Sequence, residues 1–124
     1  MAYRLYSENG NGSHRNGRGQ SWYEGLGAEE QKAIRRVVLL LQEFGATLGF
    51  PQSSAIARSA IALRELRVQH AGEPYRILYV FDPARQAVLL VGGNKVGKGN
   101  RWYEKAIRLA ERLYAEYLKE TQGG

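Results

Sequence analysis

Apolar residues recur at helical spacing in two stretches of this 124-residue chain. The first stretch has acidic residues near its start and Gly45, a common helix terminator, near its end. The stripe residues are Ala33, Ile34, Val37, Val38, Leu41, Phe44 and Leu48 in the first stretch, and Trp102, Ala106, Leu109, Leu113 and Tyr117 in the second. The pattern therefore predicts a helix over residues 28–45 and a long C-terminal helix that begins near Arg101.

Between these helices the period changes to two. Arg64, Leu66 and Val68 alternate with Glu65, Arg67 and Gln69, as on a half-buried strand, whereas the runs "YRILYVF" and "AVLLV" are apolar on both faces. The short turns "HAGEP" and "DPARQ" join these three runs, which predicts an antiparallel β-meander. Strands that are apolar on both faces need cover from helices. The predicted fold class is thus α+β, with N-terminal helical segments packed on a small antiparallel sheet and a C-terminal helix.

The N-terminal part of the chain gives weaker signals. Residues 7–20 are rich in Gly, Asn, Ser and Arg without periodicity, and only "YRLY" before them looks like a strand. Ser21 and Glu24 have capping-box spacing and predict a short helical turn, while "GFPQSS" further on is interpreted as a turn. We therefore predict an irregular arm over residues 1–20, a candidate for disorder, and one domain over residues 21–120.

Composition limits the possible functions. The absence of cysteine excludes disulfides and thiolate metal sites, and no apolar run is long enough to span a bilayer or to form a signal-peptide core. We therefore expect a cytoplasmic protein. A net charge of +6 favours polyanionic partners, above all nucleic acid. An evenly solvated basic surface explains the charge alone equally well.

One motif suggests a nucleotide-binding P-loop. Gly92, Gly97 and Lys98 fit the pattern G-x-x-x-x-G-K, but Gly99 stands where the magnesium-binding Ser or Thr belongs. The helix signal also begins several residues later, and the sequence after this loop amounts to about one helix, whereas a P-loop protein needs further parallel strands. We therefore predict that the match is accidental and that the protein uses no nucleotide cofactor.

The basic residues of this segment still need an explanation. Lysines and arginines gather here around two aromatic residues, namely Lys95, Lys98, Arg101, Lys105 and Arg108 around Trp102 and Tyr103. Cations interleaved with aromatic rings suit a single RNA strand. The alternative is a solvated loop above a core that contains both rings. Trp102 begins the apolar stripe and is therefore predicted to lie in the core. For Tyr103 both a core position and contact with RNA remain possible.

A longer series of residues resembles a known family. "ELR", "PYRILY", "FDP", the segment "GGNKVGKG" and "RWYE" follow one another between Glu65 and Glu104. In this order they resemble the RelE/ParE toxin superfamily, in particular the HigB-like, phage-derived branch of type II toxin–antitoxin systems. The resemblance extends over roughly residues 22–118.

The resemblance implies a RelE-like fold and a specific activity. Ribosome-dependent members are endoribonucleases, or mRNA interferases, that cut mRNA in the ribosome without a metal or other cofactor, inhibit translation and arrest growth. The 2′-hydroxyl of the mRNA attacks the adjacent phosphate, and basic residues with a tyrosine or histidine assist. The implied partners are the ribosome, mRNA and a HigA-like helix-turn-helix antitoxin.

The resemblance also implies roles for single residues. Arg76 matches a strand arginine that contacts the scissile phosphate, Lys95 matches the basic residue that closes the last strand, and Tyr103 lies near the tyrosine that opens the final helix. Arg67 and His70 complete the candidate catalytic set. The candidate RNA-binding residues are Arg64, Lys98, Arg101 and Lys105. The plainer alternatives are that Arg76 pairs with Asp82 or Glu65 and that His70 is a solvated turn residue.

Two other functions stay open at this point. ParE-like relatives share the fold but inhibit DNA gyrase by binding and cleave no RNA, and the irregular N-terminus also fits a decayed, non-catalytic prophage remnant. The basic and aromatic residues predicted at the end of the sheet favour the nuclease.

Overall fold

The structure, a computed structural model, describes residues 1–7 and 21–122. Most of the arm predicted over residues 1–20 therefore lies outside the described residues. The elements are strand β1 (Ala2–Tyr6), helices α1 (Ser21–Glu24) and α2 (Ala28–Phe44), the 3-10 turn η1 (Gly45–Thr47), strands β2 (Ser53–Ala55), β3 (Arg64–His70), β4 (Glu73–Phe81) and β5 (Ala87–Asn94), and helix α3 (Gly99–Gln122).

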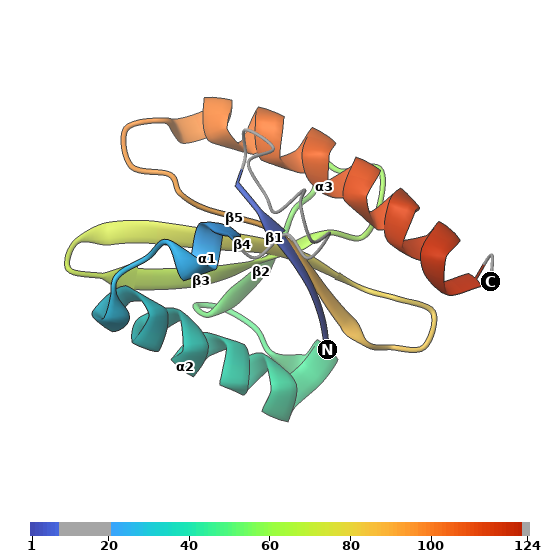
Figure 1. The fold of residues 1–124 in the computed structure, drawn as a ribbon, viewed down its shortest axis with the longest axis horizontal. Coiled ribbons are helices and arrows are strands. Elements are labelled where there is room, and N and C mark those ends of the chain that lie inside the picture. The colour runs from blue at the N-terminus through green and yellow to red at the C-terminus, as the bar shows by residue number, and fades with distance from the viewer. Residues whose placement is uncertain (8–20, 123–124) are drawn as a thin grey trace.

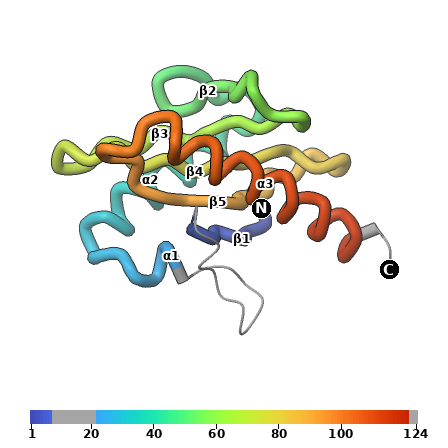
Figure 2. The backbone as a smooth tube through the Cα atoms, turned by 90° about the horizontal axis from the view of Figure 1, so that it is seen from above, coloured from blue at the N-terminus to red at the C-terminus, as the bar shows by residue number. Residues whose placement is uncertain are grey.

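The sheet lies between two helices in a three-layer arrangement, with α3 on one face and α2 on the other (Figure 1). Its five strands follow the order β1-β5-β4-β3-β2, which Figure 2 shows from one edge to the other. Alternate residues of β4 enter different cores: Leu78 packs on the α3 side and Ile77 on the α2 side. This two-sided burial explains the uninterrupted apolar runs, and the α+β prediction is confirmed.

Both predicted helices are present. Glu30 caps the start of α2 by accepting a hydrogen bond of 2.8 Å from the Gly27 N–H, and the helix ends where Gly45 adopts a φ of 55°. Trp102 is 1% exposed, so its predicted place in the core is confirmed. No helix within the described ranges is long and apolar enough to cross a membrane.

The predicted meander of β3, β4 and β5 is confirmed, but the sheet is larger and mixed. β1 pairs with β5 in parallel, so the predicted antiparallel sheet is extended by one parallel strand. The segment predicted as a turn, residues 49–54, ends in the first two residues of β2, which pairs antiparallel with β3. Periodicity did not reveal β2 because its buried residue is Ser53, whose hydroxyl pairs with the Tyr79 hydroxyl at 2.5 Å.

The glycines of the P-loop match have a packing explanation. β5 runs on to Asn94 and includes Gly92, the first glycine of the match, so its backbone belongs to a sheet strand. A Cβ atom on Gly92 would lie 2.6 Å from Cε3 of Trp22 in α1. Gly92 therefore allows Trp22 to pack against β5. Helix α3 starts at Gly99, directly after Lys98 of the P-loop match, and not at Arg101 as predicted.

We predict that Gly92→Ala destabilises the protein by about 1–3 kcal/mol, because the new methyl group forces the Trp22 ring out of place. Urea denaturation of both proteins measures the change. Gly49→Ala is the matched control, since nothing lies within 4 Å of the position that its new methyl group would take, and it should stay within about 0.5 kcal/mol of wild type. Equal stabilities for the two variants would contradict the packing explanation.

Candidate active site

Two arginines face each other across neighbouring strands. Arg67 of β3 is the register partner of Arg76 of β4, and paired residues point to the same face of a sheet. That face is the one covered by α3. Arg76 is 5% exposed, whereas Arg67 is half-buried. Like charges placed directly opposite each other repel, so this pair needs a negative partner nearby.

Glu65 provides that negative charge. This side chain is 6% exposed, and its Oε2 accepts hydrogen bonds from Arg67 Nη1 at 3.1 Å and from the Ser54 hydroxyl at 2.9 Å. Its Oε1 lies 3.7 Å from Arg76 Nε. One carboxylate thus serves two guanidinium groups, and it is buried together with hydrogen-bond donors that compensate for its lost hydration.

Tyr103 brings α3 to the same carboxylate. Its hydroxyl donates a hydrogen bond of 2.5 Å to Glu65 Oε1. Two cations lie against its ring: Lys95 Nζ is 5.5 Å and Arg58 Cζ is 5.4 Å from the ring centroid. We call Glu65 with Arg58, Arg67, Arg76, Lys95 and Tyr103 the Glu65 cluster. It combines four cations with one carboxylate, so its net charge is positive.

The environment of Tyr103 changes its acidity. Burial, and after it the hydrogen bond to Glu65, raises the pKa of Tyr103 from 10.0 to about 12, while Arg76 acts in the opposite direction. Tyr103 therefore carries its proton at neutral pH and directs it at Glu65. Since the pKa is raised on folding, its contribution to stability is complete below pH 10 and is lost as the pH rises toward 12.

A groove of about 320 Å³ opens beside the arginine pair. Arg36 of α2 lines it together with Arg67 and Arg76, and its remaining lining residues are uncharged: Ala33, Val37, Pro51, Gln52, Val68 and Gln69. Arg76 Nε is buried and has no hydrogen-bond partner within the described part of the chain. A buried donor without a hydrogen bond is costly, and the Glu65 carboxylate at 3.7 Å is too distant to accept one, so this N–H keeps an unused hydrogen-bonding capacity in a residue that lines the groove.

The structure brings four of the predicted catalytic residues together, namely Arg67, Arg76, Lys95 and Tyr103. It does not bring His70 to them. His70 ends β3 near Glu30 of α2, where the hydrogen bond from Tyr75 is the main cause that lowers the pKa of Glu30 and His70 adds a smaller effect. Even-numbered residues of β3 point to the α2 face, which explains this separation.

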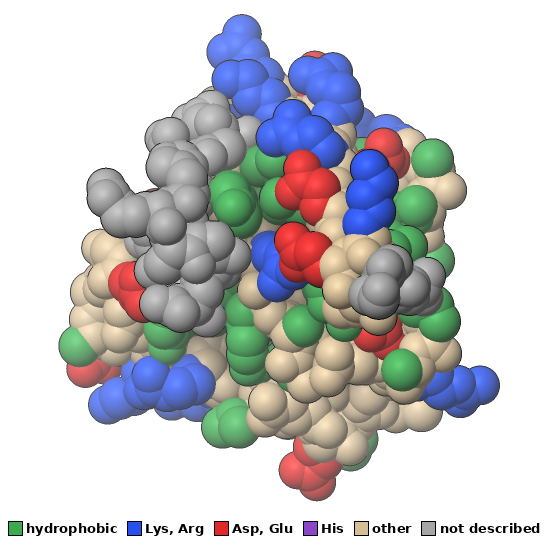
Figure 3. All heavy atoms as spheres, turned by 45° about the vertical axis from the view of Figure 1, so that its right-hand side comes forward, with side chains coloured by type: hydrophobic (Ala, Val, Ile, Leu, Met, Phe, Trp, Pro, Cys, Tyr) green, Lys and Arg blue, Asp and Glu red, His purple; other side chains and the backbone are tan. Residues whose placement is uncertain are grey.

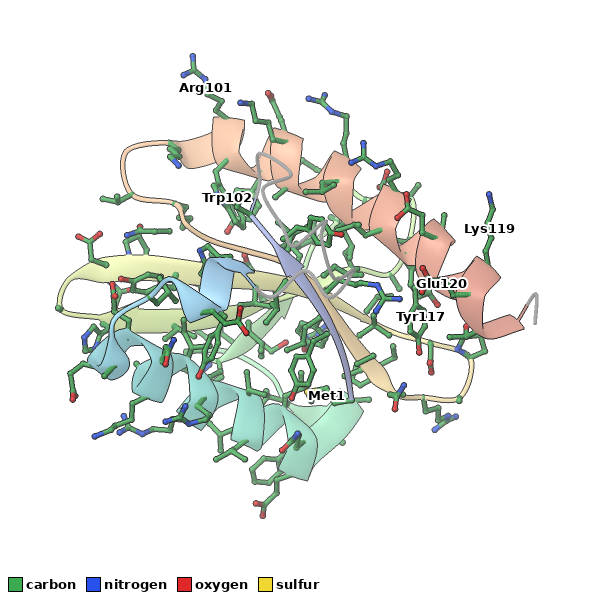
Figure 4. The ribbon with its side chains drawn as sticks, viewed as in Figure 1. Met1, Arg101, Trp102, Tyr117, Lys119 and Glu120 are labelled. Atoms are coloured by element: carbon green, nitrogen blue, oxygen red, sulfur yellow. The ribbon has the colours of Figure 1, made fainter. Side chains whose placement is uncertain are left out.

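The predicted RNA-binding residues lie in two different places. Arg64 belongs to the α2 face, where its Nε donates to the Ser53 hydroxyl at 3.1 Å. Lys98, Arg101 and Lys105 are exposed on the loop after β5 and on the first turns of α3. Arg101 points away from the sheet and Trp102 points toward it (Figure 4). Figure 3 shows basic side chains along the upper edge of the molecule, the side on which α3 runs in Figure 1.

Glu65, the centre of the cluster, appeared in the sequence only as one possible partner of Arg76. The other suggested partner, Asp82, instead accepts hydrogen bonds from the Tyr117 hydroxyl and the Gln86 N–H, both at 2.8 Å. A charged residue within the "ELR" run was the available signal for Glu65, but alternation placed it on a solvated face. No three His, Asp or Glu side chains gather as a metal site in residues 1–7 and 21–122.

Comparison with known proteins identifies the family. The family described as "Phage derived protein Gp49-like (DUF891)" matches residues 21–115. The chain belongs to this family. No solved structure matches the chain.

Two relatives from Mycobacterium tuberculosis are similar over most of this chain. "Putative toxin HigB2" is 36% identical over 104 residues, which cover 82% of this chain and 52% of the relative. "Putative toxin HigB3" is 37% identical over 106 residues, which cover 85% of this chain and 91% of the relative. The chain thus spans about half the length of the first relative and most of the second. The predicted membership of a HigB-like, phage-derived branch is confirmed.

We predict that Glu65→Gln lowers the pKa of Tyr103 from about 12 toward 10, but only in part, because the burial of Tyr103 remains. Tyrosine labelled with ¹³C at Cζ reports ionisation by NMR, and at about pH 11 the Tyr103 signal should shift only in the variant. Tyr103→Phe assigns this signal.

Tyr75 is the internal control for this titration. Its pKa is also raised to about 12, first by burial and then by Glu30, so Glu65→Gln should leave its signal unchanged. A Tyr103 signal that titrates identically in wild type and variant would show that Glu65 does not hold the Tyr103 proton.

Proposed function

We propose that this protein is the toxin of a type II toxin–antitoxin system and that it cuts ribosome-bound mRNA without a metal ion. The family and the names of the two relatives support the toxin role. The observation that carries the nuclease proposal is the buried Nε of Arg76, which has no hydrogen-bond partner within the described residues, at a groove lined by arginines. A phosphate diester supplies anionic oxygens that can accept the hydrogen bond that this donor does not make in the structure. The protein's neutralising partner in this proposal is a HigA-like helix-turn-helix antitoxin.

Arg67 and Arg76 act on the phosphate in this proposal. The 2′-hydroxyl of the RNA attacks the adjacent phosphorus, a bond forms between O2′ and phosphorus, and the bond from phosphorus to O5′ breaks. The products are a 2′,3′-cyclic phosphate and a free 5′-hydroxyl. Negative charge grows on the equatorial oxygens during the attack, and preorganised guanidinium donors stabilise that charge more than they stabilise the ground state.

In this proposal Tyr103 and Glu65 together accept the proton of the attacking 2′-hydroxyl. As O2′ attacks, its proton passes to the Tyr103 oxygen, and the Tyr103 proton moves along the 2.5 Å hydrogen bond to Glu65 Oε1. Lys95, which lies against the Tyr103 ring, donates a proton to the leaving O5′. Solvent then returns Glu65 and Lys95 to their starting states, so protons balance over the cycle.

Expression of the protein without antitoxin tests the proposed function. We expect growth to stop and primer extension on translated messages to show new 5′ ends, because cleavage leaves discrete truncated mRNAs. Intact messages accompanied by gyrase–DNA cleavage products would instead assign the protein to the ParE-like inhibitors. Normal growth at high expression would indicate a non-catalytic remnant.

We predict that Arg76→Ala lowers the rate of mRNA cleavage by about 10²- to 10³-fold, the usual effect of losing one preorganised donor. Single-turnover cleavage of ribosome-bound mRNA measures the rate. Arg76→Lys should also be strongly impaired, because an ammonium group keeps the charge near Glu65 but lacks the planar fork of donors.

The control for these variants is Arg85→Ala, which removes an exposed arginine in the turn between β4 and β5. Its cleavage rate should equal that of wild type. Since Arg76 is buried, thermal melting must show that each variant is folded at the assay temperature. A folded Arg76→Ala protein with the wild-type rate would remove Arg76 from the mechanism.

A further inference from the structure

Phe50 is an aromatic residue on the surface beside the groove. Its side chain is 76% exposed, more than any other large hydrophobic residue within the described ranges. It lies between η1 and β2, and the next two residues, Pro51 and Gln52, line the groove. A single exposed hydrophobic side chain is common on protein surfaces, so its exposure alone implies no function. The arginine groove next to Phe50 is what suggests a function for this ring.

One face of the Phe50 ring is in contact with a groove arginine. The Arg67 guanidinium carbon lies 5.3 Å from the ring centroid, and Arg67 is the same residue that Glu65 holds by a hydrogen bond of 3.1 Å. With 76% of the residue exposed, the opposite face of the ring is open to solvent. A flat apolar face is therefore available next to a fixed cation.

The backbone holds Phe50 in this position. On its N-terminal side Leu48 is buried in the core, and Gly49 accepts a hydrogen bond of 2.9 Å from the Ser53 N–H. On its C-terminal side Gln52 accepts a hydrogen bond of 2.8 Å from the Arg67 N–H. Since both sides are anchored, the ring needs little ordering when a ligand binds, which favours affinity.

The combination of groove and ring selects one chemical class of ligand. The groove presents Arg36, Arg67 and Arg76, and no acidic residue lines it, so it suits phosphates. An open aromatic face suits the π-surface of a nucleobase. A protein partner would need both an apolar contact for the ring and carboxylates for the three arginines, whereas one nucleotide carries a π-surface and a phosphate together.

We propose that Phe50 and the arginine groove form a binding site for one nucleotide of single-stranded RNA, whose base stacks on Phe50 while a neighbouring phosphate contacts Arg67. This inference rests on the proposed function for the identity of the strand and adds a subsite adjacent to Arg76. Stacking tolerates every base, so this site sets the position of the strand more than its sequence.

Binding without cleavage tests the proposal. The probe is a fluorescent single-stranded oligoribonucleotide in which every 2′-hydroxyl is methylated, so that no cleavage is possible, and anisotropy measures its affinity. We expect Phe50→Ala to weaken binding by about 5- to 150-fold, the range for losing one stacked base. Phe50→Trp should bind at least as tightly as wild type.

Two controls isolate the stacking contact. Phe44→Ala removes another exposed phenylalanine, 50% exposed at the end of α2, which does not line the groove, and should leave affinity unchanged. The second control is a series of probes, each with a single abasic nucleotide at a different position. For one of these probes the affinity of the wild-type protein should fall as much as the affinity for the full probe falls in Phe50→Ala. That same probe should bind the Phe50→Ala protein no more weakly than the full probe.

Several outcomes would overturn the subsite: absence of RNA binding by wild type, equal affinity of wild type and Phe50→Ala, or loss of antitoxin binding alone in Phe50→Ala. The last result would make Phe50 part of a protein interface. Phe50-dependent RNA binding in a protein that cuts no mRNA would support the subsite and contradict the nuclease proposal.

Discussion

The buried carboxylate of Glu65 is the interaction on which the rest of the structure around the site depends. It accepts hydrogen bonds from Ser54 of β2, Arg67 of β3 and Tyr103 of α3, and it lies 3.7 Å from Arg76 of β4. Without it, two arginines would face each other on adjacent strands under a helix, which like-charge repulsion and desolvation both oppose. The carboxylate thus joins four elements and allows a positive cluster to form around the buried Arg76.

The charge balance around Glu65 also determines the chemistry of the site. Glu65 has a single negative charge but several cationic neighbours, so the cluster keeps an excess of positive charge beside the groove. Arg76 Nε lies 3.7 Å from Glu65 Oε1 but has no hydrogen-bond partner within the described residues, and Tyr103 stays protonated because its pKa is raised to about 12. In the proposed mechanism these groups are the anion-binding donors and the proton relay, and the fold holds them in fixed positions before any substrate arrives, which is the condition for electrostatic catalysis.

Periodicity was sufficient to predict the two long helices, the meander of β3, β4 and β5, and the buried position of Trp102, because these depend on local apolar spacing. It could not show that β1 runs parallel to β5, since pairing joins residues far apart in the chain. β2 was missed because Ser53 is buried through a hydrogen bond and not through apolar character.

The same reasoning applies to the candidate site. Glu65 was recognised only as a possible partner of Arg76, since Tyr103 meets it from 38 residues away. Resemblance to a family grouped Arg64, Arg67, His70 and Arg76, although alternation along β3 puts Arg64 and His70 on the face opposite Arg67, as the structure shows. The exposure of Phe50 beside Arg67 likewise depends on a loop path that no local pattern encodes. Whether the Glu65 cluster works as one catalytic unit is tested most directly by single-turnover cleavage of ribosome-bound mRNA with Arg76→Ala, Tyr103→Phe and the double variant. Residues that act as a unit are non-additive, so the double variant should be about as slow as the slower single variant. Rate losses that multiply in the double variant would contradict the account.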